Sequence, residues 1–126
     1  MSLRTPLSAA RGLGSAKEGV DHWWKQRLTA IALVPLLLWF GFSVALLGTA
    51  DYYTVVGWLA HPINTGLMIL VLATGLWHGV LGLQVVIEDY IATEWKKITV
   101  LLLVQSLAVV MALAGILAVL RIALGV

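Results

Sequence analysis

The sequence predicts an all-α integral membrane protein with three membrane-spanning helices, and three observations support this. First, 61% of the 126 residues are hydrophobic and only 11% are charged, at a mean hydropathy of +1.00, which is more apolar surface than a water-soluble domain of this size can bury. Second, three uncharged stretches each reach the ~20 residues that cross a hydrocarbon layer ~30 Å thick. Third, apolar and polar residues do not alternate in these stretches as they do in barrel strands. Because lipid requires every backbone group to be paired within a helix or a closed barrel, the stretches are predicted to be helices.

The predicted spans cover residues 28–48, 63–87 and 98–120, which contain 21, 25 and 23 residues without Asp, Glu, Lys or Arg. Residues 1–27 precede them as an N-terminal arm, and residues 121–126 follow as a short tail. The first 20 residues are expected to be a disordered cytoplasmic arm. An organelle transit peptide is the alternative, which Glu18 and Asp21 disfavour. Pro35 lies inside the first span and predicts a kink, because proline removes a helix hydrogen bond.

The positive charges predict the orientation, since cytoplasmic segments carry an excess of Lys and Arg. The N-terminal arm holds five of them, the first loop none, the second loop Lys96 and Lys97, and the tail only Arg121. The N-terminus should therefore be cytoplasmic and the C-terminus periplasmic. Aromatic residues would anchor both interfaces: Trp23, Trp24 and Trp95 inside, and Tyr52, Tyr53 and Trp58 outside.

Composition also excludes several function classes. The net charge of +2 is too small for a nucleic-acid binder, so no nucleic-acid partner is expected. The chain has no cysteine, and can hold neither an iron–sulfur cluster on thiolates nor a disulfide nor a thiolate nucleophile. Any redox role must then use a bound cofactor or the centres of a partner.

His78 is the only ionisable side chain inside a predicted span, 15 residues after Ile63. Neutral imidazole is a common ligand of transition metals and haem iron. Gly75 and Gly82 share its helix face and Gly79 lies to one side, so another backbone or a flat macrocycle could approach closely. A buried histidine bonded to a neighbouring helix, with glycines that serve helix packing, explains the same pattern.

The second anomaly is the run Glu88-Asp89-Tyr90 at the cytoplasmic end of the second span. Two acids at a helix C-terminus oppose the helix dipole. Asp89 follows His78 by 11 residues, about three turns, so both lie on one face ~16 Å apart. A carboxylate and a phenol near the interface suit a quinone, whose carbonyl oxygens need hydrogen bonds and protons. An interfacial belt tyrosine is the alternative for Tyr90.

The remaining polar residues have simpler interpretations. Arg27 is expected to be an interfacial cation or, with haem at His78, the partner of a haem propionate. His22 and His61 flank the spans and are expected to be solvated. Interhelical hydrogen bonds are expected for the polar residues within and beside the spans: Thr29, Ser43, Asn64, Gln84, Gln105 and Ser106.

The run from Leu76 to Tyr90 (LWHGVLGLQVVIEDY) resembles the signature of the small hydrophobic membrane anchor subunit of succinate dehydrogenase, respiratory complex II. In that family a histidine is followed after 11 and 12 residues by Asp and Tyr. The stretch Arg27-Leu28-Thr29-Ala30-Ile31 is similar to the family's Arg-x-Thr-Ala-Ile start of the first span. The resemblance covers roughly residues 22–120, and residues 12–19 are similar to alphaproteobacterial members.

The resemblance implies specific roles. His78 would be an axial ligand of haem b and bind its iron, Arg27 would contact a haem propionate, and Tyr90 would hydrogen-bond ubiquinone with support from Asp89. It also implies a bacterial inner-membrane protein whose partners are a flavoprotein subunit, an iron–sulfur subunit and a second, cytochrome b-type anchor subunit.

Counting ligands supports such partners independently. A six-coordinate haem needs two axial ligands, and this chain has one histidine at membrane depth, so the second ligand must come from another polypeptide. Three helices with exposed polar and glycine surface also suggest a larger helical bundle completed by a second anchor subunit. We therefore expect a subunit of an enzyme that catalyses nothing alone. The alternatives are a haem-less structural anchor and a small proton-coupled transporter subunit that uses His78 as a proton relay.

Overall fold

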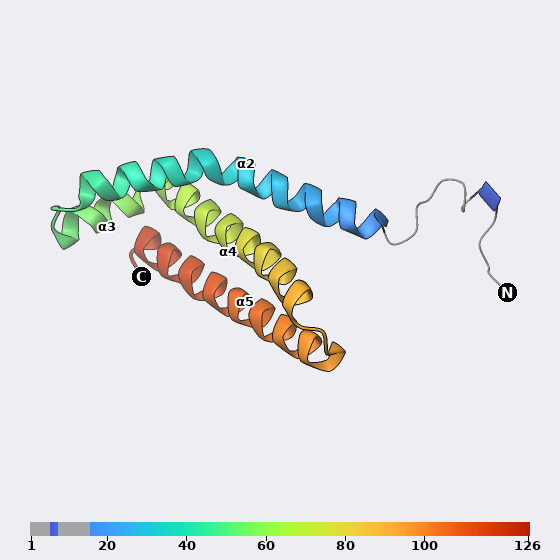
Figure 1. Cartoon of the computed structure of the whole chain (residues 1–126). Helices are drawn as coiled ribbons and strands as arrows, with labels where there is room; N and C mark the ends of the chain where they lie inside the picture. The colour runs from blue at the N-terminus through green and yellow to red at the C-terminus, as the bar shows by residue number, and fades with distance from the viewer. Residues whose placement is uncertain (1–5, 8–15) are drawn as a thin grey trace.

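The computed structural model describes residues 6–7 and 16–126 and is built from helices (Figure 1). Three of them are long and apolar enough to cross a membrane, which confirms the predicted class. A fourth, short helix lies between the first two long ones. The elements are α2 (Ala16–Leu47), α3 (Tyr52–Ala60), α4 (Pro62–Tyr90) and α5 (Glu94–Leu124).

Each long helix extends past the apolar stretch that predicts it. α2 begins at Ala16 rather than at residue 28, so the part of the N-terminal arm from Ala16 onward is helical instead of disordered. Residues 1–5 and 8–15 of the arm lie outside the described residues. Helical hydrogen bonds form between backbone groups and need no apolar side chains. A helix can therefore continue beyond the ends of its apolar stretch. α2 is bowed in Figure 1, and Pro35 lies inside this helix.

The short helix α3 occupies the segment that the sequence suggests only as a loop. Its first turn is capped by Asp51, whose carboxylate accepts a hydrogen bond from the Thr54 backbone N–H at 3.0 Å. Hydrogen bonds from the side chain and backbone of Thr54 hold the pKa of Asp51 below its ordinary value. Trp58 of α3 stacks on Trp39 of α2, with ring centroids 5.6 Å apart. The cap and the stacked rings fix α3 at the end of the bundle opposite the α4–α5 turn.

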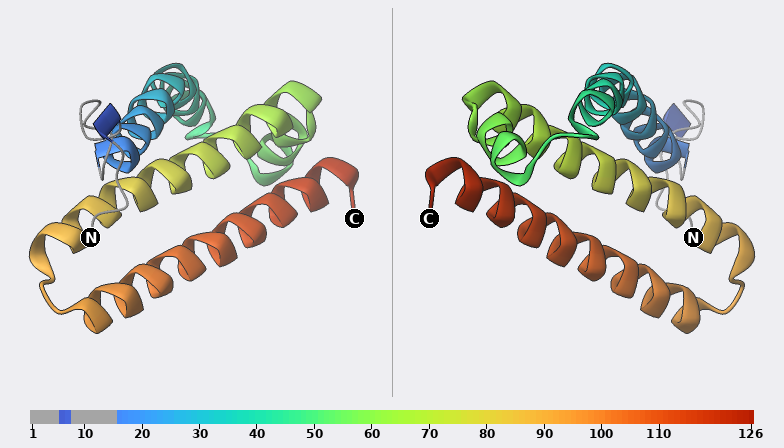
Figure 2. Two further views of the ribbon diagram at one scale, coloured as in Figure 1. Left: turned by 90° about the vertical axis from the view of Figure 1, so that its right-hand side faces the viewer. Right: turned by 90° about the vertical axis from the view of Figure 1, so that its left-hand side faces the viewer.

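Helix α4 is the centre of the arrangement, because α2 and α5 both pack mainly against it. Figure 2 shows α2 and α5 on different sides of α4, with α3 beside the far end of α5. Among the glycines that the structure describes, the closest approach lies in the α4–α5 contact, where a Cβ on Gly115 would meet Leu72 Cδ1 at 3.1 Å. The histidine-bearing helix therefore has a neighbour on two sides.

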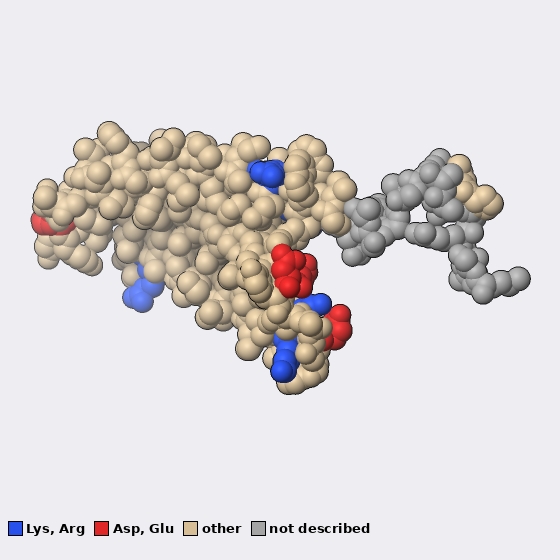
Figure 3. Space-filling view, viewed as in Figure 1, with Lys and Arg blue, Asp and Glu red and all other residues tan. Residues whose placement is uncertain are grey.

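Within the described residues the chain buries very little apolar surface against itself. Its buried hydrophobic side chains are only Leu33, Leu81, Ile87 and Val119, and no side chain is fully buried. In the most apolar window of α5 no residue is buried at all. In Figure 3 charged side chains gather near the α4–α5 turn, while most of the long helices' visible surface is uncharged. Such a surface is suited to contact lipid tails or further helices rather than water.

Candidate functional site

The imidazole of His78 lies between α2 and α4, where its Nδ1 is 2.9 Å from Oγ1 of Thr29. Thr29 is buried, with 7% of its surface exposed. The same hydroxyl donates to the backbone carbonyls of Lys25 at 2.8 Å and Gln26 at 3.0 Å. The interhelical role predicted for Thr29 is confirmed, and its partner is the one ionisable residue at membrane depth.

Glycines on either side of His78 let α2 come close to α4. A Cβ on Gly75 would lie 3.9 Å from Leu33 Cδ2, and one on Gly82 would lie 3.7 Å from Gln26 Nε2. The two helices are thus antiparallel: positions 26, 29 and 33 of α2 lie against positions 82, 78 and 75 of α4, respectively. A Cβ on Gly79 would meet nothing within 4 Å, and Gly79 lines a hollow of about 270 Å³ between α4 and α5.

Two further polar atoms of α2 are buried. Nε2 of His22 and Oε1 of Gln26 are shielded from solvent and have no hydrogen-bond partner among the residues that the structure describes. The expectation that His22 is solvated is therefore wrong for this ring nitrogen. His61 is exposed as expected, and its Nδ1 caps α4 by accepting from the Ile63 N–H at 3.3 Å. The spacing of positions 22, 26, 29 and 33 could have revealed this face of α2, because residues three and four apart lie on one side of a helix.

Arg27 does not share the position of Thr29, although only two residues separate them. Its side chain is exposed, and the guanidinium carbon lies 5.2 Å from the centroid of the Trp23 ring. Two residues in a helix are rotated by about 200°, so Thr29 faces α4 and Arg27 points elsewhere. In the described part of the chain no hydrogen bond or ion pair joins Arg27 to His78.

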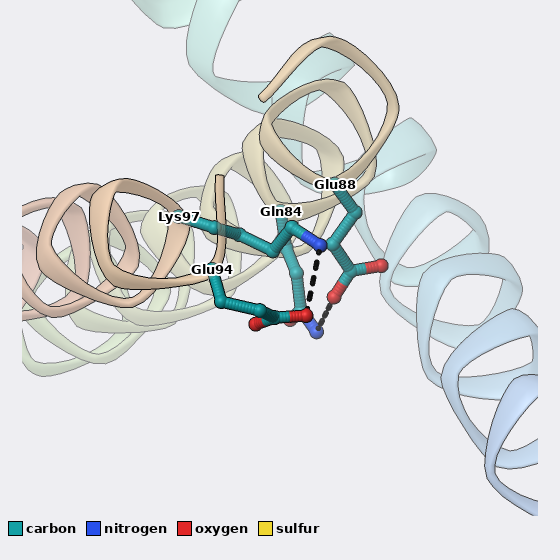
Figure 4. Close-up of polar contacts among 4 residues, drawn as sticks. All are labelled: Gln84, Glu88, Glu94 and Lys97. Atoms are coloured by element: carbon teal, nitrogen blue, oxygen red, sulfur yellow. Dashed lines mark hydrogen bonds and ion pairs between the residues drawn. The ribbon is translucent and has the colours of Figure 1, made fainter. Parts of the chain in front are cut away.

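The acidic end of α4 faces the start of α5. Gln84 donates to a carboxylate oxygen of Glu88 at 2.9 Å within α4, so the interhelical bond predicted for Gln84 is wrong. Lys97 and Glu94 form an ion pair at 3.6 Å in the first turn of α5. Figure 4 shows these four side chains close together at the turn between the two helices. Of the two acids that oppose the dipole of α4, Glu88 is thus hydrogen-bonded by Gln84 of its own helix.

Tyr90 and Asp89 are exposed at this end of α4, and Tyr90 has 86% of its surface accessible. A phenol this exposed is available to a ligand or to another subunit. Among the described residues no group of three or more His, Cys, Asp and Glu side chains is placed to hold a metal ion. A metal at His78 would therefore need a prosthetic group and a ligand from elsewhere.

Comparisons with known proteins agree with the sequence signature. The profile of the succinate dehydrogenase/fumarate reductase transmembrane subunit family matches residues 1–117. The succinate dehydrogenase hydrophobic membrane anchor subunit of Rickettsia bellii is 36% identical over 116 residues, which cover 92% of this chain and 93% of that protein. The corresponding subunit of Paracoccus denitrificans is 31% identical over 97 residues, covering 77% of this chain and 75% of that protein.

A third relative has a similar name and a similar degree of identity. The succinate dehydrogenase membrane anchor subunit of Reclinomonas americana is 33% identical over 96 residues, which cover 74% of this chain and 80% of that protein. No solved structure matches the chain significantly. Since the family profile spans nearly the whole chain and the relatives match over most of their length, this chain belongs to the succinate dehydrogenase/fumarate reductase transmembrane subunit family.

Proposed function

We propose that this chain is the small membrane anchor of a succinate dehydrogenase and that it helps to form a haem b site and a ubiquinone site. The observation that carries the anchor role is the family match, which runs through α2, α3 and α4 and most of α5. These helices include three that can cross a membrane. Family membership favours this role over a proton-coupled transporter subunit.

The catalytic chemistry would belong to other subunits. A chain without cysteine cannot carry iron–sulfur clusters on thiolates, so electrons from succinate would reach the membrane through a flavoprotein subunit and an iron–sulfur subunit. This chain would be part of the enzyme without being catalytic alone. A second, cytochrome b-type anchor subunit would cover the exposed apolar faces of the three long helices, which bury only a small core against one another.

The surroundings of His78 fit a haem b ligand. Thr29 occupies Nδ1, so Nε2 is the nitrogen that remains for iron. When bound, haem b would supply one-electron redox chemistry. Another iron ligand would come from the second anchor subunit. Arg27, close in sequence to Thr29 and exposed, would pair with a haem propionate.

The ubiquinone site would lie at the cytoplasmic end of α4. The exposed hydroxyl of Tyr90 would donate a hydrogen bond to a carbonyl oxygen of the quinone head group, and the neighbouring Asp89 would support the site and exchange protons with water. The positive charges of the N-terminal arm, and Lys96 and Lys97 in the first turn of α5, support a cytoplasmic position for this end. The C-terminus would then be periplasmic, in a bacterial inner membrane.

The test is purification of the affinity-tagged chain from its native membrane in a mild detergent, with mass spectrometry of the co-purifying bands and an assay of succinate-dependent quinone reduction. We expect a flavoprotein, an iron–sulfur protein and a second small membrane protein, together with this activity. If those partners co-purify but the complex contains no haem, the chain is a haem-less structural anchor. Recovery of the chain without them would contradict the proposed function.

A further inference from the structure

The hydrogen bond between Thr29 and His78 has a direction that its surroundings determine. The Thr29 hydroxyl carries a single proton, and its oxygen lies 2.8 Å from the Lys25 carbonyl oxygen and 3.0 Å from that of Gln26. Both carbonyls can only accept. If the hydroxyl donated to His78 instead, its lone pairs would face these two oxygens at hydrogen-bond distance. The proton of Thr29 therefore goes to the carbonyls, and Nδ1–H of His78 donates to Oγ1.

This direction fixes the tautomer of the neutral ring. With the proton on Nδ1, Nε2 carries the free lone pair, which is the form that binds a metal. Water is a poor substitute for the hydroxyl here, because Thr29 is buried between the helices with 7% of its surface exposed. Thr29 in turn is held by the backbone of its own helix, through carbonyls three and four residues earlier. The acceptor is thus oriented before any ligand binds.

We infer that Thr29 is a positioning residue that presents Nε2 of His78 to the iron of the proposed haem b and raises the electron donation of the imidazole. When the ring nitrogen that does not bind the metal donates a hydrogen bond to an acceptor, this bond orients the metal-bound histidine and increases its basicity. A more basic axial ligand stabilises the ferric state, so this bond lowers the reduction potential of the haem. The inference rests on the haem ligand role proposed for His78.

The experiment compares the purified parent complex with Thr29→Val, Thr29→Ser and Thr29→Cys. Thr29→Val has nearly the same shape without an acceptor, Thr29→Ser keeps the hydroxyl, and Thr29→Cys offers sulfur, a weaker acceptor. The readouts are the haem content per flavin and the midpoint potential from a spectroscopic redox titration. Neither depends on turnover.

We expect Thr29→Val to retain haem roughly 10- to 100-fold less tightly and to raise the midpoint potential. A tenfold shift of the oxidised-to-reduced ratio corresponds to ~59 mV for this one-electron couple. Thr29→Ser should match the parent, and Thr29→Cys should lie between the parent and Thr29→Val. The graded order separates tuning by a hydrogen bond from a packing defect, which would not follow the strength of the acceptor.

Parental potential and haem content in Thr29→Val would overturn the inference and leave the haem proposal intact. If Thr29→Val does not assemble, a potential in Thr29→Cys equal to that of the parent overturns it instead. A parent complex that contains no b-type haem would refute the haem proposal itself.

Discussion

At the scale of single residues, the candidate site is organised around one pair. His78 is the ionisable residue at membrane depth, and Thr29 is the neighbouring-helix side chain that bonds it, at 2.9 Å. The sequence pointed to His78 through its isolation in an apolar span, and to Thr29 only as a polar residue in need of a partner. Which residues pair across two helices depends on the helix register, and a single sequence does not reveal that register.

Tyr90 gives the prediction for the quinone site. We expect Tyr90→Phe to slow quinone reduction roughly five- to tenfold, because the lost hydrogen bond is worth about 1 to 1.5 kcal/mol. The measurement is succinate:ubiquinone reductase activity of the purified complex, normalised to its flavin content. Tyr53→Phe is the matched control, since Tyr53 is also exposed but lies in α3 at the other end of the bundle. Equal quinone activity in Tyr90→Phe and the parent would refute the role given to Tyr90.

At the scale of helices, the order and number of the long elements follow from hydropathy, whereas their ends and contacts do not. The uncharged stretches predict α2, α4 and α5, but these helices run on through charged residues such as Glu94, which opens α5. α3 was not expected, because a helix of nine residues is too short to register as a membrane-spanning stretch, which takes ~20 residues. Its cap at Asp51 and its contact with Trp39 are local and tertiary features that average hydropathy does not register.

The packing of α4 on α5 gives a prediction at this scale. An alanine in place of a helical glycine usually stabilises by about 0.5–1 kcal/mol, but a Cβ at Gly115 would lie only 3.1 Å from Leu72 Cδ1. In Gly115→Ala, this close contact should offset the stabilisation that alanine gives in a helix. At Gly66 a Cβ would meet nothing within 4 Å, so Gly66→Ala should be more stable than Gly115→Ala by about 1 kcal/mol. Thermal unfolding of the two complexes in detergent measures this difference. Equal stability would show that the Leu72 side chain moves aside without destabilising the protein.

At the scale of the whole molecule, the chain resembles one side of a larger assembly. Its long helices expose most of their apolar residues, and α2 and α5 each pack mainly on α4. In the proposed haem site, the one histidine at membrane depth would supply one iron ligand and a partner subunit would supply the other. Composition predicted the need for partners, and the small buried core of the described residues supports it.

The orientation of the bundle can be tested with single cysteine variants. The chain has no cysteine of its own, so the introduced thiol is the only one that it carries. Thr49→Cys lies in the α2–α3 connection and Thr93→Cys in the α4–α5 turn. A membrane-impermeant thiol reagent should label Thr49→Cys when added to spheroplasts, and should label Thr93→Cys only in inverted vesicles stripped of the catalytic subunits. The reverse pattern would place the N-terminus in the periplasm and contradict the charge argument.

An absorption spectrum tests most directly the proposal that His78 of this anchor holds a haem between chains. The dithionite-reduced minus oxidised spectrum is recorded for the purified parent complex and for His78→Ala, with His61→Ala as the control at an exposed histidine. We predict a b-type spectrum in the parent and in His61→Ala and a loss of most of this haem in His78→Ala, with the partner subunits still bound. An unchanged b-type spectrum in the assembled His78→Ala complex would contradict the claim.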